Sequence, residues 1–164
     1  MSAPPKQVTR IRAPVRLTYQ VSAGRQLTAF LNGIAEERLL GQRCDQCKKV
    51  YVPPRPGCPT CGVFLGAQVE VKDTGTVTTF CVVNVPFEGQ TMKLPYVYAC
   101  IALDGADNAL HHLIQAPPED VRMGLRVRAE WLPAGERPRS MEAIRWFTPT
   151  GEPDAPWESY QEHL

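Results

Sequence analysis

Short apolar runs separated by turn-forming residues occupy the chain from residue 67 to residue 147. These runs are rich in β-branched and aromatic residues, which favour strands. The expected strands are 68–72, 76–85, 96–103, 109–115, 125–132 and 141–147. Residues 117–120 read as a short helical or turn insert. Five or more short strands with one such insert are typical of a small Greek-key barrel, so we predict a mainly β fold of the OB type for residues 67–147.

A different period runs through residues 22–40, where apolar side chains recur at helical spacing. They are Leu27, Phe30, Leu31, Ile34, Leu39 and Leu40. Ser22 could cap this helix, and Glu36, Glu37 and Arg38 would lie on its outer side. The amphipathic helix either packs on its own domain or docks on another protein, and the sequence leaves both interpretations open.

The two ends of the chain show weaker patterns. Residues 1–21 form an N-terminal arm in which Val15, Leu17, Tyr19 and Val21 alternate with polar residues and with Arg10, Arg12 and Arg16. Such alternation favours an extended strand lying on a surface. The C-terminal tail, 148–164, is rich in proline and is expected to be irregular, with Trp157 and Tyr160 as possible anchors.

Composition narrows the class of protein. The 164 residues include 18 lysines and arginines against 17 acidic residues, so no overall charge favours nucleic acid or membranes. No run is apolar enough to span a bilayer, and the first residues lack the apolar core of a signal peptide. Cys81 and Cys100 lie in apolar runs and are expected to be buried free thiols. We therefore expect a soluble, cytoplasmic protein.

Two Cys-x-x-Cys pairs carry the strongest chemical signal in the chain. Cys44 and Cys47 form the first pair, and Cys58 and Cys61 form the second. Each pair can direct two sulfurs at one ion, and four thiolates make a closed tetrahedral set that suits Zn²⁺. Residues 41–66 are too few to bury a core, so metal binding would supply the folding energy of a zinc ribbon.

Other uses of these cysteines fit less well. Disulfides would require an oxidising compartment, and nothing in the sequence suggests export. A thioredoxin-like site needs a Cys-x-x-Cys that opens a helix after a strand, which neither pair does. Iron would use the same four sulfurs, so zinc and iron both remain open. No further ligand or open position is evident, which favours a structural metal.

No self-sufficient catalytic set is visible in the sequence. His111 and His112 are adjacent, so in a strand they face opposite sides and cannot hold one metal together. Nucleic-acid binding would need a basic groove with stacking aromatics. Arg122, Arg126 and Arg128 are interspersed with acidic residues, and few basic residues accompany the aromatic ones. We predict that the chain is no enzyme on its own and that nucleic acid is not its partner.

The order of these motifs resembles a known family. It looks like the bacterial and archaeal acyl-CoA-associated proteins that join an N-terminal rubredoxin-like zinc ribbon to an OB fold. The matching segments are 43–47 (Arg-Cys-Asp-Gln-Cys), 52–55 (Val-Pro-Pro-Arg), 58–61 (Cys-Pro-Thr-Cys) and 75–80 (Gly-Thr-Val-Thr-Thr-Phe). Pro95 and Tyr96 before an apolar strand also fit. The resemblance covers about residues 22–147.

The resemblance implies a non-catalytic accessory subunit. Proteins of this family bind thiolases, or sterol-carrier-protein-like thiolases and aldolases, in hetero-oligomers. In these assemblies the partner enzyme performs the chemistry. In some complexes the companion helps to enclose the CoA. Residues 146–153 resemble the corresponding segment of relatives that serve steroid side-chain degradation, and the family resemblance is also compatible with fatty-acid degradation.

A loop at 87–95 is the candidate contact with a CoA thioester shared with the partner. Lys93 could meet a phosphate, and Met92 or Leu94 could meet an acyl chain; an ordinary barrel loop explains the same residues. Two other functions remain as alternatives. One is a single-stranded nucleic-acid-binding OB-fold module, and the other is a stand-alone acyl-CoA-binding protein.

Overall fold

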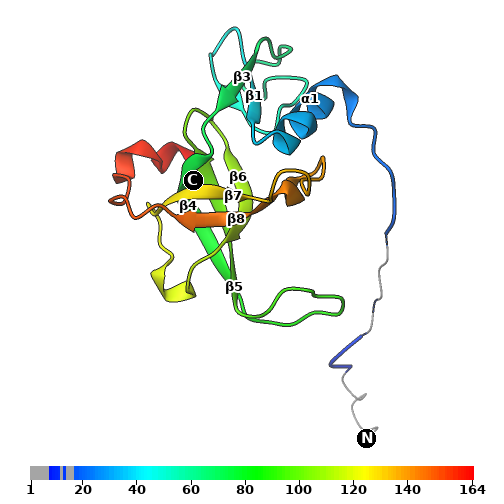
Figure 1. Cartoon of the computed structure of the whole chain (residues 1–164), viewed down its shortest axis with the longest axis vertical. Coiled ribbons are helices and arrows are strands. Elements are labelled where there is room, and N and C mark those ends of the chain that lie inside the picture. Colours follow the sequence, from blue (N-terminus) through cyan, green and yellow to red (C-terminus); the bar gives the residue numbers. More distant parts are fainter. Residues whose placement is uncertain (1–7, 12, 14–16) are drawn as a thin grey trace, which may run out of the picture.

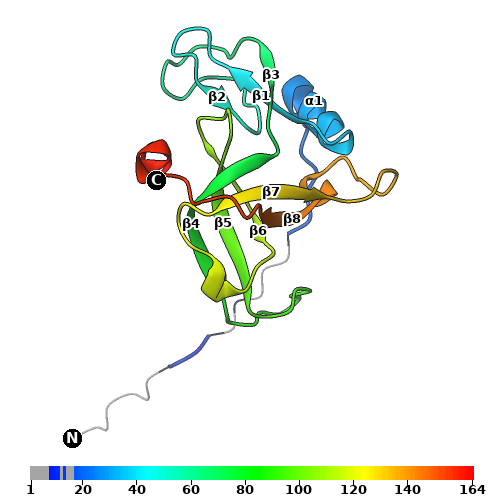
Figure 2. The ribbon, with the colours of Figure 1, turned by 60° about the vertical axis from the view of Figure 1, so that its left-hand side comes forward.

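The computed structural model describes residues 8–11, 13 and 17–164. A closed β-barrel forms the body, and a small three-stranded sheet with a single α-helix lies at one of its ends (Figures 1 and 2). The predicted mainly β fold with an N-terminal helix and an OB-type barrel is therefore confirmed. No helix in the described residues is long and apolar enough to cross a membrane.

Five strands close the barrel in the order β4-β5-β6-β8-β7. They are β4 (Thr74–Val83), β5 (Tyr96–Leu103), β6 (Ala109–Ile114), β7 (Arg126–Trp131) and β8 (Ile144–Pro149). All neighbours are antiparallel except β6 and β8. Val77, Ile101, Val127 and Phe147 are fully buried and fill the interior. The apolar residues at alternate positions of each strand thus supply the core.

Single-turn 3-10 helices complete this part of the chain. They are η1 (Pro118–Asp120), η2 (Met141–Ala143), η3 (Trp157–Ser159) and η4 (Gln161–His163). The predicted insert at 117–120 is η1, and the start of the predicted strand 141–147 is η2. The C-terminal tail (148–164) begins within β8 and then returns to the barrel. There Tyr160 is buried, and the centres of its ring and of the Trp157 ring are 5.4 Å apart.

A three-stranded sheet, β2-β1-β3, carries the cysteines. Its strands are β1 (Leu39–Arg43), β2 (Val50–Tyr51) and β3 (Gln68–Val71), with β1 antiparallel to both neighbours. The 68–72 run, expected in the barrel, therefore pairs with β1 instead. It leads directly into β4, so one continuous stretch of chain joins the small sheet to the barrel (Figure 1).

The helix is shorter than its apolar pattern suggested, and the 22–40 prediction is wrong at both ends. α1 spans Gly24–Ala35 and has no side-chain cap, although Ser22 was the expected cap. It ends because Glu37 adopts a left-handed backbone (φ 62) and the Arg38 amide bonds back to the Gly33 carbonyl at 2.8 Å. This is the Schellman pattern of a helix C-terminus.

Leu39 and Leu40 belong to β1 because pairing with β3 satisfies their backbone groups. The apolar face of α1 also has a partner within the chain. Phe30 and Ile34 are 1% and 0% exposed and join the same core cluster as the barrel residues. The helix thus packs on its own domain, and the hypothesis that its apolar face docks on another protein is wrong.

Two further expectations need correction. Leu17, Tyr19 and Val21 are 73–78% exposed and form no strand, although the arm was expected to lie on a surface; Arg12, Val15 and Arg16 lie outside the described residues. Cys81, expected to be buried, is exposed. A bulge between Val77 and Thr79 changes the alternation of β4, which leaves Cys81 beside the half-exposed Tyr98 on the outer face.

Side chains from the turn between β5 and β6 lock the small sheet to the barrel. The Asp107 carboxylate accepts from the Val50 amide at 2.7 Å, and the Asp107 amide donates to the Val50 carbonyl at 2.8 Å. Asn108 repeats this pattern at Val52: its Oδ1 accepts from the amide at 2.8 Å and its Nδ2 donates to the carbonyl at 2.7 Å. We call these four bonds the turn clamp. It satisfies the outer edge of β2 as a further strand would.

Candidate metal centre

Two tight turns of the same design present the four cysteines. In the first, the Lys48 amide donates to the Cys44 carbonyl at 3.0 Å, and Lys48 has a left-handed backbone (φ 64). In the second, the Gly62 amide donates to the Cys58 carbonyl at 2.9 Å, and Gly62 has φ 70. Each turn thus reverses the chain at the fourth residue after its first cysteine. The short spacing of each pair dictates this local geometry.

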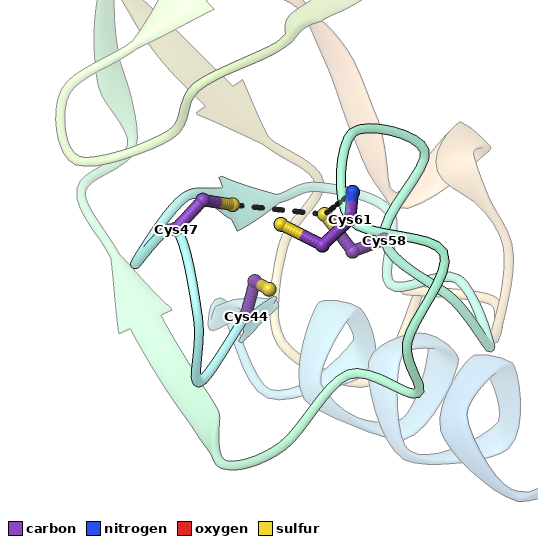
Figure 3. Close-up of side chains that lie close together, drawn as sticks. All are labelled: Cys44, Cys47, Cys58 and Cys61. Carbon is purple, nitrogen blue, oxygen red and sulfur yellow. Dashed lines mark hydrogen bonds between the residues drawn. The ribbon is translucent and has the colours of Figure 1, made fainter.

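The two turns bring all four sulfurs together (Figure 3). The Sγ atoms of Cys44, Cys47, Cys58 and Cys61 lie within 4.8 Å of one another, and those of Cys47 and Cys58 are 3.6 Å apart. Sulfurs bound tetrahedrally at ~2.3 Å from one zinc would be ~3.8 Å apart. Cys44 and Cys58 are buried, whereas Cys47 and Cys61 are half-buried. The donor set and its spacing fit one tetrahedral metal ion that is closed to substrate.

The charges of the thiols also favour a cation. Burial opposes ionisation of Cys58, but hydrogen bonds from the Tyr51 hydroxyl and the Cys61 and Thr60 amides lower the pKa of its thiol to about 6. The hydrogen bond with Cys47 and then burial raise the pKa of Cys61 to about 12. Four thiolates this close repel one another, so a bound cation is required to hold all four ionised.

Tyr51 is a supporting residue that the sequence reasoning did not single out. Its hydroxyl lies 3.5 Å from the Cys58 sulfur and 3.5 Å from the Thr60 hydroxyl, while the Arg55 guanidinium lies 5.3 Å from its ring centre. Such outer contacts orient metal ligands. The available signal was the position of Tyr51 in a strand between the two cysteine pairs.

The comparisons with known proteins agree with this geometry. One family model, the ChsH2 rubredoxin-like zinc ribbon domain, matches residues 31–65, and a second, the ChsH2 C-terminal OB-fold domain, matches residues 68–132. Together they account for more than half of the chain. The protein belongs to the ChsH2 family. The resemblance predicted from the cysteine pairs and the barrel motifs is thereby confirmed.

Individual relatives carry related descriptions. A probable enoyl-CoA hydratase alpha subunit of Thermomonospora curvata is 30% identical over 80% of this chain and 41% of its own length. A DUF35 domain-containing scaffold protein of Methanocaldococcus jannaschii is 34% identical over 56% of this chain and 65% of its own length. The match therefore spans less than two thirds of each of these relatives.

Solved structures show the same arrangement. One described as "Ltp2-ChsH2(DUF35) aldolase" matches with a TM-score of 0.60 and 29% identity, covering 79% of this chain and 98% of that one. A DUF35-family protein of unknown function from Sulfolobus solfataricus matches with a TM-score of 0.53 at 24% identity, over 62% of this chain and 74% of that one, which shows the fold alone. The fold of this chain is thus found in a solved structure at 29% identity.

The candidate CoA loop of this ChsH2-family chain lies far from the cysteines. The connection between β4 and β5 projects from the end of the barrel opposite the small sheet (Figure 1). Met92 and Lys93 line a cavity of about 390 Å³ there, but Leu94 does not. Trp146, which sequence reasoning did not consider as a lining residue, closes part of this cavity from β8. The cavity is apolar in most of its lining, with Lys93 as its basic residue.

The remaining titratable candidates have structural partners. The His112 ring packs against the Phe147 ring, with 5.6 Å between the ring centres, and burial lowers the pKa of the His112 imidazole. His111 on the opposite face meets Tyr98 at 6.2 Å. His112 is half-buried and His111 is exposed, so the two histidines face opposite sides of β6 as expected for adjacent strand residues.

The basic cluster at and just before β7 is paired with acidic side chains. Arg122 binds Asp154 at 2.6 and 2.8 Å. Arg126 binds Asp104 at 2.7 and 2.8 Å, and Arg128 lies 4.0 Å from Asp73. These pairs reduce the charge available to a phosphate backbone, which weakens the case for nucleic-acid binding.

Proposed function

We propose that this chain is a non-catalytic accessory subunit of a thiolase-like enzyme that acts on CoA thioesters. The observation that carries the proposal is the match to the Ltp2-ChsH2 aldolase structure, because it covers 98% of the matched chain, both ribbon and barrel. The relatives described as scaffold proteins and as an enoyl-CoA hydratase alpha subunit support a role beside an acyl-CoA enzyme.

The metal of the ribbon is zinc in this proposal. Four thiolates with no open position suit Zn²⁺ in a structural site, and the ribbon is too small to fold without it. Its four side chains would hold the two turns together and, through the turn clamp, keep the ribbon aligned on the barrel. We place the protein in the cytoplasm, where reducing conditions keep thiols available to the metal.

The ribbon offers a surface for the partner enzyme. Phe64 is 86% exposed, although it follows directly after the metal-binding turn and precedes the buried Leu65. Large exposed aromatics are typical anchors of protein interfaces. Since the apolar face of α1 is already covered, we assign docking to the ribbon around Phe64 rather than to that face.

The loop at the other end of the barrel is the proposed contact with the CoA thioester. Lys93 would pair with a phosphate, and Met92 would contact the acyl chain near the 390 Å³ cavity. Leu94 stays a weaker candidate because it does not line the cavity. A single partner that touches both the ribbon and this loop must extend along the length of the barrel (Figure 1).

Affinity capture from the native cell with a tagged chain, followed by mass spectrometry and metal analysis, tests the proposal. We expect a thiolase-family protein at near one-to-one stoichiometry and about one zinc per chain. Recovery of zinc without such an enzyme would overturn the function. Salt-sensitive retention on single-stranded DNA would favour the nucleic-acid alternative, and tight acyl-CoA binding by the chain alone would favour a carrier.

Two variants separate docking from CoA contact. Phe64→Ala should weaken capture of the enzyme about tenfold or more, as loss of an aromatic anchor does. Lys93→Ala should leave capture unchanged and raise the KM of the complex for CoA thioesters with steroid side-chain or fatty acyl groups. Met123→Ala and Lys72→Ala are exposed controls that should change neither quantity. Full capture by Phe64→Ala would refute the ribbon as the docking surface.

A further inference from the structure

Positive charge is concentrated at the start of the chain. Residues 1–35 carry five basic side chains and no acidic one, whereas residues 36–164 carry 13 basic and all 17 acidic side chains. The five are Lys6, Arg10, Arg12, Arg16 and Arg25. The near-neutral total of +1 therefore hides a basic segment joined to an acidic body. Such asymmetry indicates a partner with negative charge.

The described residues just before α1 have an apolar face without a partner. Leu17, Tyr19 and Val21 are 78%, 77% and 73% exposed, and the polar Thr18 and Gln20 alternate with them. No hydrogen bond between described residues involves any of these five. In Figure 1 the blue segment that precedes α1 runs clear of the barrel. Its side chains and backbone groups are both available.

Period-two alternation distinguishes the possible partners of this segment. A strand places Leu17, Tyr19 and Val21 on one face, whereas a helix would spread them around its surface. A membrane-bound amphipathic helix would require the helical period instead. An extended segment with free backbone groups and alternate apolar side chains fits the exposed edge of another protein's sheet.

We propose that residues 17–21 add as a β-strand to an exposed sheet edge on the partner enzyme subunit, with carboxylates of the partner facing the basic residues that flank the strand. This inference rests on the proposed function for the identity of the partner. The segment precedes both matched family domains, which begin at residues 31 and 68. It therefore adds partner specificity that the shared ribbon and barrel do not carry.

The test uses the full-length zinc-loaded chain and the purified enzyme subunit identified by the capture experiment. A variant with Leu17→Ser, Tyr19→Ser and Val21→Ser changes only exposed side chains, so its fold should be unaffected. We expect its affinity for the enzyme to fall at least about tenfold. Met123→Ser, a change at an exposed apolar residue elsewhere, should leave affinity unchanged.

Two further measurements make the mechanism specific. Hydrogen exchange at alternate amides within residues 18–21 should slow on complex formation, because an added edge strand bonds its one neighbouring strand through every second residue. Arg10→Glu combined with Arg25→Glu should weaken binding mainly at low salt, since screening removes their contribution at high salt.

The outcomes separate this inference from the proposed function. If the unaltered chain captures no acyl-CoA enzyme, the proposed function fails and the inference fails with it. Equal enzyme binding by the triple variant and the unaltered chain would overturn the inference alone. Unchanged enzyme affinity with lost binding to anionic phospholipid vesicles, or to single-stranded DNA, would overturn it in favour of those ligands. Weaker enzyme binding without slowed exchange at 18–21 would refute strand addition.

Discussion

Removal of the Asn108 side chain tests whether the turn clamp joins ribbon and barrel into one stable unit. Asn108 satisfies both backbone groups of Val52, which is 0% exposed, through bonds of 2.8 and 2.7 Å. Asn108→Ala leaves an amide and a carbonyl buried without these partners. A buried unsatisfied group costs about 1–3 kcal/mol, so we expect the free energy of unfolding to fall by about 2–4 kcal/mol.

Urea unfolding of the zinc-loaded protein, followed by circular dichroism, measures this loss. Asn84→Ala is the matched control, because the exposed Asn84 side chain makes one long hydrogen bond within the described residues, to the Val82 carbonyl at 3.3 Å. It should change stability by less than about 0.5 kcal/mol. Asn108→Asp keeps an acceptor for the Val52 amide, so its free energy of unfolding should lie between those of Asn108→Ala and Asn84→Ala. If Asn108→Ala is as stable as the control, the clamp does not contribute as we infer.

Three further perturbations probe the metal, an ion pair and the barrel. Chelation of zinc, or Cys58→Ser, should unfold the ribbon and lower the Tm, as read by metal analysis and calorimetry, because binding supplies the folding energy of such sites. Hydrogen bonds from Arg126, opposed by burial and assisted by Thr74, lower the pKa of Asp104. The ionised Asp104 should therefore stabilise the fold above about pH 4, and this stabilisation should be lost as the pH falls below that value. Asp104→Asn should flatten the acid part of the curve of stability against pH. Gly75→Ala should cost about 1–3 kcal/mol in urea unfolding, because a Cβ there would lie 2.6 Å from the Ala102 carbonyl oxygen.

Each of these has a control and a contrary result. Cys81→Ser, outside the cluster, should keep its zinc and Tm; loss of zinc in that variant, or its retention in Cys58→Ser, would contradict the four-cysteine site. Equal acid sensitivity of Asp104→Asn and the unaltered chain would exclude the ion pair as its source. Gly57→Ala should be nearly neutral because its Cβ would meet its nearest atom at 3.5 Å. A Gly75→Ala protein as stable as this control would show that β4 and β5 can move apart.

Patterns that depend on neighbouring residues were readable from the sequence. The spacing of each Cys-x-x-Cys pair dictates a turn, and two such turns so close in the chain predicted that Cys44, Cys47, Cys58 and Cys61 would gather. Strands 96–103 and β5 share the same bounds, and 109–115 and β6 differ by one residue, because apolar runs bounded by turn residues favour strands locally. The family resemblance followed from these same local motifs.

Contacts between distant residues were decided only by the tertiary structure. Leu39 and Leu40 continue the helical pattern, yet their pairing with β3 draws them into a strand once Glu37 has ended α1. Asn108 lies in the turn before β6, and its partner Val52 is 56 positions away. A local pattern indicates which residues favour burial or a turn. Which distant residue each of them contacts depends on the tertiary fold of the whole chain, and no local signal in a single sequence specifies that contact.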